Sequence, residues 1–305
     1  MDGRAIVVIT GPTATGKTRL SVLLAKRFGG EIVNADSMQV YRGMDIGTSK
    51  PTIEERGGVP HHMFDIVEPG DAYSVSRYVE EATKVVTEIQ ARGNVPFVVG
   101  GTMLYIDSLV RGRTFAASDP DVRKAVESLS DPYSELKRVD PDGAANLHPN
   151  DRLRVVRALE IVRLTGKTIA QHNAETMSRA DAFNSTKIAL DFADRNFLYF
   201  MIDKRVDSML KCGLVDEVRR LNVRTNAIGY KEIAAALRGE CSMDSAVMSV
   251  KQASRNYAKR QITWLRQDLS VNRILRDEEI DMERTLHIST GILEKAGYNA
   301  INPDV

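Results

Sequence analysis

Short runs of consecutive apolar residues alternate with amphipathic segments over the first hundred positions of the chain. Ala5–Thr10 (AIVVIT), 31–34 and 96–99 (PFVV) have strand length and the continuous apolar character that is typical of strands buried on both faces of a sheet. Residues 18–28 and 74–92 have helical composition, and glycine follows each of them. This order of elements predicts an α/β fold whose core is a parallel sheet flanked by helices.

The pattern changes between residues 116 and 192, where polar helical segments are interrupted by Pro and Asp. We interpret this stretch as a mostly helical insertion. Residues 197–202 (FLYFMI) are again an apolar run of strand length and predict a return to the sheet. Residues 1–115 and 193–305 would then form one α/β core, with further helices up to about residue 268.

Composition narrows the class of protein without revealing its partner. With 305 residues, 43% of them hydrophobic and 27% charged, the chain can bury a core without disulfides or a structural metal. The 42 basic and 41 acidic residues nearly cancel, so a nucleic-acid surface would have to be a local patch. Cys212 and Cys241 are far apart, and no apolar run has the length of a membrane span. We therefore expect reduced thiols, no membrane and a cytoplasmic location.

A phosphate-binding loop follows the first predicted strand. The string GPTATGKT fits G-x-x-x-x-G-K-[ST] and lies between a predicted strand and a predicted helix, which is the context this motif requires. Its glycines let backbone N–H groups turn toward a pyrophosphate, the lysine reaches the outer phosphate, and the threonine hydroxyl can hold Mg2+. The candidate residues are Gly11, Pro12, Thr13, Ala14, Thr15, Gly16, Lys17 and Thr18. The loop predicts a P-loop NTPase-like core with Mg2+ as cofactor, but it does not say which bond is broken.

Polar residues follow other predicted strands, and the carboxyl ends of parallel strands share one edge of a sheet. Asp36 comes directly after the second strand and could serve as a general base or, alternatively, as a helix cap. The string Gly-Gly-Thr102 follows the third strand and should line the same crevice. Arg205 lies just beyond residues 197–202 and could clamp a phosphate or form a surface ion pair.

A basic segment lies near the end of the predicted helices. Residues 251–266 hold five basic residues and no acidic one. At about 100° per residue, Lys251, Arg255, Lys259 and Arg266 fall within roughly an 80° stripe. A solvated helix face normally mixes both signs of charge, so we interpret the stripe as a surface for a nucleic-acid phosphate backbone.

These residues alone leave several enzyme classes open. A kinase of a small metabolite would use the phosphate-binding loop, Asp36 and Arg205 with ATP, but it would leave the basic stripe unexplained. A nucleic-acid-dependent NTPase would explain the stripe, yet no convincing acidic strand follows PFVV to hold its metal ion. A transferase that displaces a whole diphosphate from carbon would use the phosphate-binding loop equally well, and the loop alone does not separate these classes.

The motifs, taken in order, resemble one family. They span residues 11–266 and read GPTATGKT, NADSMQVYRGMDIGTSKP, HHMFDIVEP, PFVVGGTMLYIDSL, HPNDRLRVVRALEI, IDKRVDSML, NAIGYKE and YAKRQITWLR. Together they resemble the bacterial tRNA dimethylallyltransferases. The resemblance implies transfer of a dimethylallyl group from its diphosphate to N6 of the adenosine directly 3′ of the tRNA anticodon, with release of diphosphate. The AIGYKE and AKRQITW strings favour this branch over enzymes that prenylate free adenine nucleotides.

The resemblance also implies a role for individual residues. Asp36 would be the general base, Thr102 and Arg205 would assist catalysis, and residues 11–18 would bind the diphosphate, with Mg2+ on Thr18. The implied tRNA contacts are Asp36, Ser37, Met38, Gln39, Thr102, Arg123, Leu153, Arg154, Arg157, Gly229, Tyr230, Lys231, Arg255, Lys259, Arg260 and Arg266. The insertion would clamp the anticodon loop, and we expect a monomer with tRNA and dimethylallyl diphosphate as partners. One departure is Met103, where the family usually carries Gly, and it adds bulk to this loop.

Overall fold

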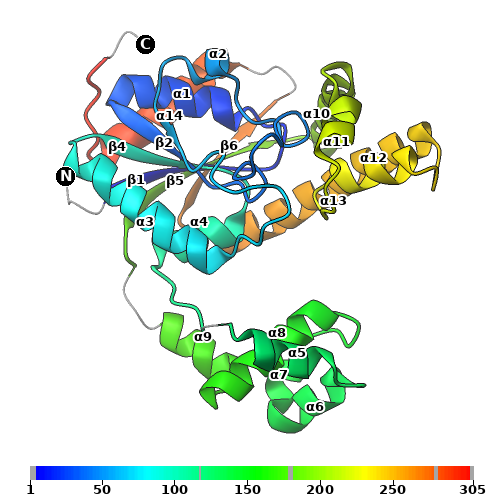
Figure 1. Ribbon diagram of the computed structural model, residues 1–305. Helices are drawn as coiled ribbons and strands as arrows, with labels where there is room; N and C mark the ends of the chain where they lie inside the picture. Colours follow the sequence, from blue (N-terminus) through cyan, green and yellow to red (C-terminus); the bar gives the residue numbers. More distant parts are fainter. Residues whose placement is uncertain (1–4, 117, 178–180, 278–280, 303–305) are drawn as a thin grey trace. The chain divides into compact units, whose positions relative to one another are not determined.

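A parallel sheet forms the centre of the computed structural model, which describes residues 5–116, 118–177, 181–277 and 281–302 (Figure 1). Within these residues the sheet has six strands in the order β3-β2-β4-β1-β5-β6. The strands are β1 (Ala5–Thr10), β2 (Gly30–Asn34), β3 (His61–His62), β4 (Val95–Val99), β5 (Asn184–Phe192) and β6 (Val271–Arg276). The α/β class and the strands predicted at 5–10, 31–34 and 96–99 are therefore confirmed.

Helices cover both faces of this sheet. The helices of the sheet unit are α1 (Lys17–Phe28), α2 (Ile53–Arg56), α3 (Val75–Ala91), α4 (Met103–Val110), α10 (Arg195–Lys211), α11 (Leu214–Leu221), α12 (Tyr230–Leu237), α13 (Met243–Gln267) and α14 (Met282–Lys295). Figure 1 shows α1 and α14 on one face, with α3, α4 and α13 on the other. None of the described helices has the length and apolar character needed to cross a membrane.

Apolar side chains of β1 point alternately to both faces of the sheet, which explains why helices cover both faces. Val7 and Ile9 are fully buried and belong to the core cluster that includes Leu24 of α1. Val8 points to the opposite face, where Ile106 of α4 lines the same small gap. A strand that is apolar on both faces has to be covered on both faces, so the AIVVIT run determines the two-sided architecture.

The prediction of a strand at 197–202 was wrong, because these residues lie inside α10. Asp194 caps the helix through its side chain, and Leu198, Ile202 and Val206 are buried at helical spacing. A short apolar run looks the same in a strand and in a partly buried helix, and the run alone could not decide between them. The chain returns to the sheet instead at β5, which pairs with β1 from Ala5↔Asn184 to Thr10↔Ala189, on the side opposite β4.

The boundary predicted for the insertion changes with that strand. The chain divides into one unit of residues 1–110 and 183–305 and a second unit of residues 111–182. The predicted end at residue 192 was therefore wrong, because β5 belongs to the sheet. The first half of β5 (NSTK) is polar, so this strand does not stand out in the sequence as an apolar run.

The second unit is helical, as predicted. Its helices are α5 (Pro120–Glu127), α6 (Pro132–Val139), α7 (Pro141–Ala145), α8 (Arg152–Thr165) and α9 (Ile169–Met177). The Asp-Pro pairs that interrupt this stretch start helices, because Asp119, Asp131 and Asp140 are N-caps followed by proline at the first helical position. Val126, Leu136 and Leu159 belong to a buried cluster of this unit.

Candidate functional site

The loop between β1 and α1 has glycine at two positions with a positive φ. Gly11 has φ +135°, and a Cβ there would overlap the Leu190 carbonyl oxygen of β5. Gly16 has φ +78° and immediately precedes the first turn of α1. The left-handed turn at Gly16 brings the loop to the helix N-terminus, where unpaired N–H groups favour an anion.

Lys17 lies against this loop, near the charges of Arg205, Arg276 and Asp36. Its Nζ donates to the carbonyl oxygens of Gly11 at 3.0 Å and Pro12 at 2.8 Å. Burial, followed by the nearby charges of Arg205 and Arg276, lowers the Lys17 pKa from 10.5 to about 7, although Asp36 opposes the shift. The lysine is therefore short of negative charge, and a bound diphosphate would supply it.

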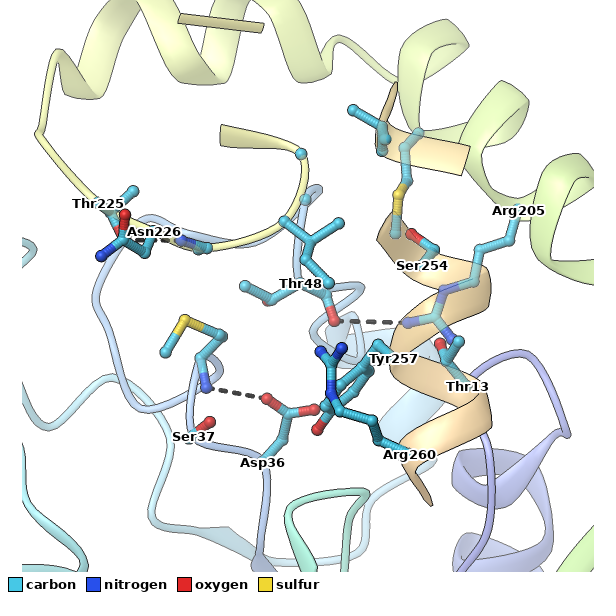
Figure 2. Close-up of a pocket in the computed structure, with 17 residues that line it drawn as sticks. Thr13, Asp36, Ser37, Thr48, Arg205, Thr225, Asn226, Ser254, Tyr257 and Arg260 are labelled. Atoms are coloured by element: carbon cyan, nitrogen blue, oxygen red, sulfur yellow. Dashed lines mark hydrogen bonds between the residues drawn. The ribbon is translucent and has the colours of Figure 1, made fainter. Parts of the chain in front are cut away.

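Asp36 is held at the carboxyl end of β2 by the backbone around it. Its N–H donates to Asn34 Oδ1 at 2.9 Å, and its Oδ1 accepts from the Met38 N–H at 2.9 Å. Figure 2 shows that the second carboxylate oxygen lies toward Tyr257 and Arg260, on the cavity side. One oxygen is thus used to orient the side chain, and the other is left to face a ligand.

A third loop, which follows β4, fixes the segment that carries Asp36. A Cβ at Gly100 would overlap Ala35, so the close approach of the two loops requires glycine. The Thr102 N–H donates to the Ala35 carbonyl at 3.1 Å, and the Ser37 N–H donates to Thr102 Oγ1 at 3.0 Å. Thr102 lines neither of the two cavities around Asp36. In this structure the hydroxyl predicted to be catalytic positions the Asp36–Ser37 segment.

Two cavities meet at Asp36. The smaller, of about 120 Å³, is lined by residues 13–18 of the phosphate-binding loop together with Gln39, Ser49 and Gln261. The larger, of about 350 Å³, has apolar walls that include Met38, Met209, Ile228 and Val250. Thr13, Asp36, Arg205 and Tyr257 line both. The arrangement places a polar, phosphate-sized compartment beside an apolar one, with a carboxylate and a guanidinium at their junction.

Arg205 reaches this junction from α10, although the strand predicted to precede it is absent. Its Nε donates to Ser49 Oγ at 2.9 Å, and its Nη2 lies 3.5 Å from the Thr48 carbonyl (Figure 2). Burial lowers its pKa, so the guanidinium gains from a nearby anion. The alternative of a surface ion pair does not describe its contacts, because the guanidinium lines both cavities.

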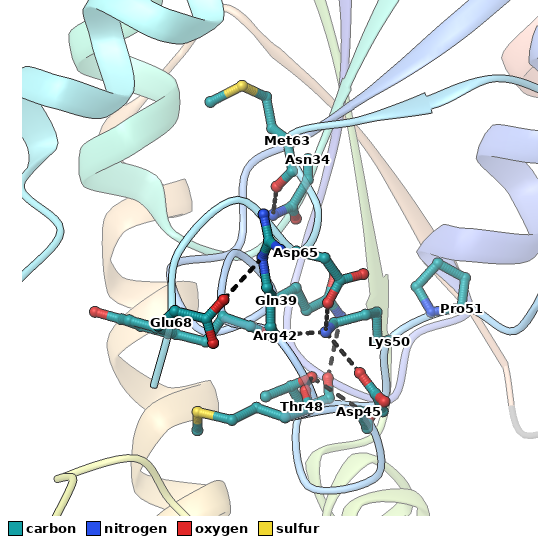
Figure 3. Close-up of polar contacts among 12 residues, drawn as sticks. Asn34, Gln39, Arg42, Asp45, Thr48, Lys50, Pro51, Met63, Asp65 and Glu68 are labelled. Carbon is teal, nitrogen blue, oxygen red and sulfur yellow. Dashed lines mark hydrogen bonds and ion pairs between the residues drawn. The ribbon is translucent and has the colours of Figure 1, made fainter. Parts of the chain in front are cut away.

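The loop of residues 39–50, which contacts Arg205, is held by hydrogen bonds and ion pairs of its own side chains. Lys50 Nζ contacts Asp45 and Asp65, each at 2.6 Å, and also donates to the Tyr41 carbonyl (Figure 3). Gln39 Nε2 donates to the Thr48 carbonyl at 3.0 Å and to the Ser49 carbonyl at 3.2 Å. Gln39, predicted as a tRNA contact, lines the smaller cavity, and its amide nitrogen is engaged in holding the loop.

The basic stripe predicted on residues 251–266 is divided by its neighbours. Lys251 pairs with Asp207 at 2.6 Å, and Arg255 pairs with Asp203 at 2.7 Å, so both side chains join α13 to α10. Lys259, Arg260 and Arg266 are exposed, and Arg260 also lines the larger cavity. Of the four residues predicted to form the stripe, Lys259 and Arg266 are therefore open to solvent, whereas Lys251 and Arg255 are engaged in ion pairs.

The three residues 229–231, which were predicted to contact tRNA, differ in their exposure to solvent. Gly229 lines the larger cavity, and Lys231 is exposed. Tyr230 is only 2% exposed, and its hydroxyl donates to buried Glu217 at 2.5 Å. The Tyr230 side chain is therefore engaged inside the protein, and a tRNA contact at this position stays a prediction. Glu217 also accepts from the N–H groups of residues 45–47, and the pair supports the loop that holds Arg205.

The site residues predicted in the insertion lie in the second unit. Leu153 is 72% exposed, and Arg154 is exposed with an Asp151 contact at 3.4 Å. Arg123 forms an exposed pair with Glu127 at 3.1 Å. Arg157 differs, because its guanidinium pairs with buried Glu160 at 2.8 Å and donates to the Ala116 carbonyl at 2.7 Å. Within this unit, Arg157 is engaged in internal contacts.

Met103 turns away from the two cavities. It is the first residue of α4, it is buried, and its sulfur accepts a hydrogen bond from the Thr10 hydroxyl at 3.5 Å. The bulk that methionine adds in place of glycine is accommodated between β1 and α4.

Three residues of the site were missed by sequence reasoning. Tyr257 and Gln261 lie one turn apart on α13 and both donate to the Gly101 carbonyl, at 3.2 and 2.9 Å. Arg276, at the end of β6, is 5% exposed and donates to the Thr15 carbonyl from behind the phosphate-binding loop. No sequence pattern indicated Gln261, because a glutamine in a basic helix is normally exposed and its burial is known only from the structure.

The oxygen atoms in the smaller cavity suit Mg2+. Thr18 lines this cavity together with Asp36 and Ser49, and hydroxyl and carboxylate oxygens are the donors that this hard cation prefers. The described residues contain no cluster of three or more His, Cys, Asp or Glu side chains able to hold a metal by themselves. Such a site would need phosphate oxygens to complete it, which is usual for Mg2+ at a phosphate-binding loop.

The chain is similar to two known protein families and to individual tRNA dimethylallyltransferases. The IPP transferase family matches residues 39–268, and the isopentenyl transferase family matches residues 4–65. The chain is 45% identical over 284 residues to the tRNA dimethylallyltransferase of Halalkalibacterium halodurans, covering 87% of this chain and 89% of that protein. It is 44% identical over 293 residues to the tRNA dimethylallyltransferase of Bacillus subtilis, covering 91% and 93% of the two chains.

Solved structures show the same similarity. The full-length tRNA isopentenylpyrophosphate transferase from Bacillus halodurans superposes with a TM-score of 0.72 at 40% identity, over 96% of this chain and 97% of the other. A eukaryotic dimethylallyltransferase acting on tRNA superposes with a TM-score of 0.82 at 31% identity, over 96% and 80%.

Proposed function

Because this chain belongs to the IPP transferase family, we propose that it transfers a dimethylallyl group from dimethylallyl diphosphate to N6 of the adenosine directly 3′ of the anticodon in tRNA. The observation that carries the proposal is the pair of cavities that meet at Asp36 and Arg205. A phosphate compartment beside an apolar compartment suits a substrate with a diphosphate head and an allylic tail.

The diphosphate would occupy the smaller cavity. Backbone N–H groups at the start of α1, together with Lys17 and Arg205, would stabilise the negative charge that grows on the diphosphate as the carbon–oxygen bond breaks. Mg2+ held by Thr18 and phosphate oxygens would neutralise part of this charge. Since Lys17 and Arg205 both have lowered pKa values before an anion arrives, they gain stability when the diphosphate binds.

Asp36 would act on the acceptor. An exocyclic adenine amine is a poor nucleophile, so it has to be aligned with the allylic carbon and relieved of a proton. Asp36 uses Oδ1 to bind the Met38 N–H, and the second oxygen can accept a hydrogen bond, and then the proton, from N6. The adenine would leave its stack to enter the larger cavity, and unstacking costs least in a single-stranded loop.

The first test follows label from dimethylallyl diphosphate into an anticodon stem-loop in the presence of Mg2+. Incorporation at the adenosine 3′ of the anticodon is the expected result. Transfer to AMP but not to RNA would indicate an enzyme acting on free nucleotides. Phosphorylation of a small metabolite by ATP, with no prenyl transfer, would replace the proposal with a kinase.

Asp36→Asn tests the role of the base in the same assay. Asparagine keeps an oxygen for the Met38 N–H but cannot take a proton, so we expect the single-turnover rate to fall by about 10² or more. Binding of dimethylallyl diphosphate should change little. A rate within a few fold of the wild type would remove Asp36 from the proton transfer.

A further inference from the structure

A single buried carboxamide joins the two loops that would hold the reacting groups. Gln261 of α13 is only 3% exposed. Its Oε1 accepts from the Thr13 N–H in the phosphate-binding loop at 3.1 Å. Its Nε2 donates to the Gly101 carbonyl, in the loop after β4, at 2.9 Å. The side chain thus contacts both loops with opposite ends of one rigid amide group.

Each loop is connected to a different substrate. The phosphate-binding loop holds the diphosphate and therefore sets the position of the allylic carbon. The loop after β4 holds Ser37 through Thr102, and so sets the position of neighbouring Asp36. The distance between the base and the leaving group depends on the spacing of these loops, and Gln261 spans that spacing.

The surrounding residues are fitted to this glutamine. A Cβ at Gly101 would overlap Gln261 Nε2, so glycine is needed for the carboxamide to reach the carbonyl. A glutamate could still accept from the Thr13 N–H but would turn a second acceptor toward the Gly101 carbonyl. Only a group with one donor and one acceptor satisfies both loops, and a buried carboxamide without these partners would be costly.

We propose that Gln261 is a positioning residue that sets the spacing between the phosphate-binding loop and the loop carrying Thr102, and thereby aligns Asp36 with the allylic carbon. The inference rests on the proposed function, since it assigns Gln261 a part in that reaction. Misalignment of about 1 Å can cost as much as 10²-fold in rate while each substrate keeps its own contacts. Loss of Gln261 should therefore reduce the rate of transfer much more than the binding of either substrate.

Gln261→Met is the main variant, because methionine has a similar volume and lacks both hydrogen bonds. We expect the single-turnover rate to fall by about 10- to 100-fold, while the dissociation constants for dimethylallyl diphosphate and for an anticodon stem-loop, each measured alone, stay within about threefold. The matched control is Gln252→Met, an exposed glutamine on the same helix that contacts Asn256, and it should behave as the wild type.

A second measurement does not depend on activity. In the wild type the Thr13 amide should be protected from hydrogen exchange, and Gln261→Met should remove that protection. Tyr257→Phe loses one donor to the Gly101 carbonyl but leaves the Thr13 N–H bonded to Gln261. The Thr13 amide should therefore stay protected from exchange in this variant. If Gln261→Met does not fold, Gln261→Glu replaces it. Its transfer rate and stem-loop affinity are then compared with those of the wild type, and the rate should fall much more than the affinity.

The outcomes separate this proposal from the proposed function. A wild-type protein that transfers no prenyl group would contradict the function itself. An active wild type with an unchanged rate in the Gln261 variant would overturn the positioning role. Equal loss of rate and of affinity for both substrates would also overturn it, because that pattern indicates general damage to the site.

Discussion

At the scale of one residue, the pKa of Lys17 depends on its burial and on the charges near it. Burial, then the charges of Arg205 and Arg276, lowers its pKa from 10.5 to about 7. Between these two values the unfolded chain binds more protons than the folded one, so this lysine makes the folded state less stable as the pH falls toward 7. A diphosphate would reverse the effect, because it favours the charged form.

Binding of dimethylallyl diphosphate at about pH 8 should therefore be accompanied by proton uptake at Lys17. Titration calorimetry in buffers of different ionisation enthalpy measures this uptake, and we expect it to approach one proton per site. Lys17→Arg keeps a cation that stays protonated, and its uptake should disappear. A binding enthalpy independent of the buffer in the wild type would show that Lys17 is already charged before the ligand binds.

At the scale of elements, α13 has different roles along its length. Its first half is joined to α10 by the Lys251–Asp207 and Arg255–Asp203 pairs. Its middle carries Tyr257 and Gln261, which hold the loop after β4. The exposed side of the helix from the same middle part onward presents Lys259, Arg260 and Arg266 to solvent. A surface for RNA phosphates is therefore expected only on the second half, and Lys259 is its clearest test.

Lys259→Ala should weaken stem-loop binding and reduce the slope of log affinity against log salt by about one. Arg255→Met is the matched change on the same helix. Because Arg255 is bound to Asp203, this variant should lower the free energy of unfolding by about 1 kcal/mol and leave the salt slope unchanged. Binding titrations at several salt concentrations and denaturant unfolding distinguish the two. Equal salt slopes for Lys259→Ala and the wild type would remove Lys259 from the RNA surface.

At the scale of the whole molecule, the insertion enters and leaves the sheet unit at one point. The Phe183 N–H donates to the Val110 carbonyl at 3.1 Å, so the two ends of residues 111–182 lie side by side. The inserted unit buries its own cluster around Val126, Leu136 and Leu159. Both observations indicate that the sheet unit does not need the insertion to close its core.

Replacement of residues 111–182 by a short Gly/Ser linker should give a folded protein that binds dimethylallyl diphosphate as the wild type does. If the insertion clamps the anticodon loop, stem-loop affinity should fall by at least about tenfold, since every contact of that unit is lost. Calorimetry and stem-loop titration provide the readouts. Unchanged stem-loop affinity would show that the sheet unit alone binds this RNA.

The sequence by itself determined the α/β class, three central strands, the phosphate-binding loop and the place of Asp36. These features are local, because an apolar run followed by a polar loop also fixes which edge of a parallel sheet the loop occupies. Only the tertiary structure decided that residues 197–202 are helical, that β5 joins the sheet beside β1 on the side opposite β4, and that Tyr230 and Arg255 are engaged inside the protein. It also revealed Gln261 and Arg276. A pattern of apolar and charged residues reports which side chains need burial or a partner, whereas the partner itself comes from a distant segment that only folding brings near.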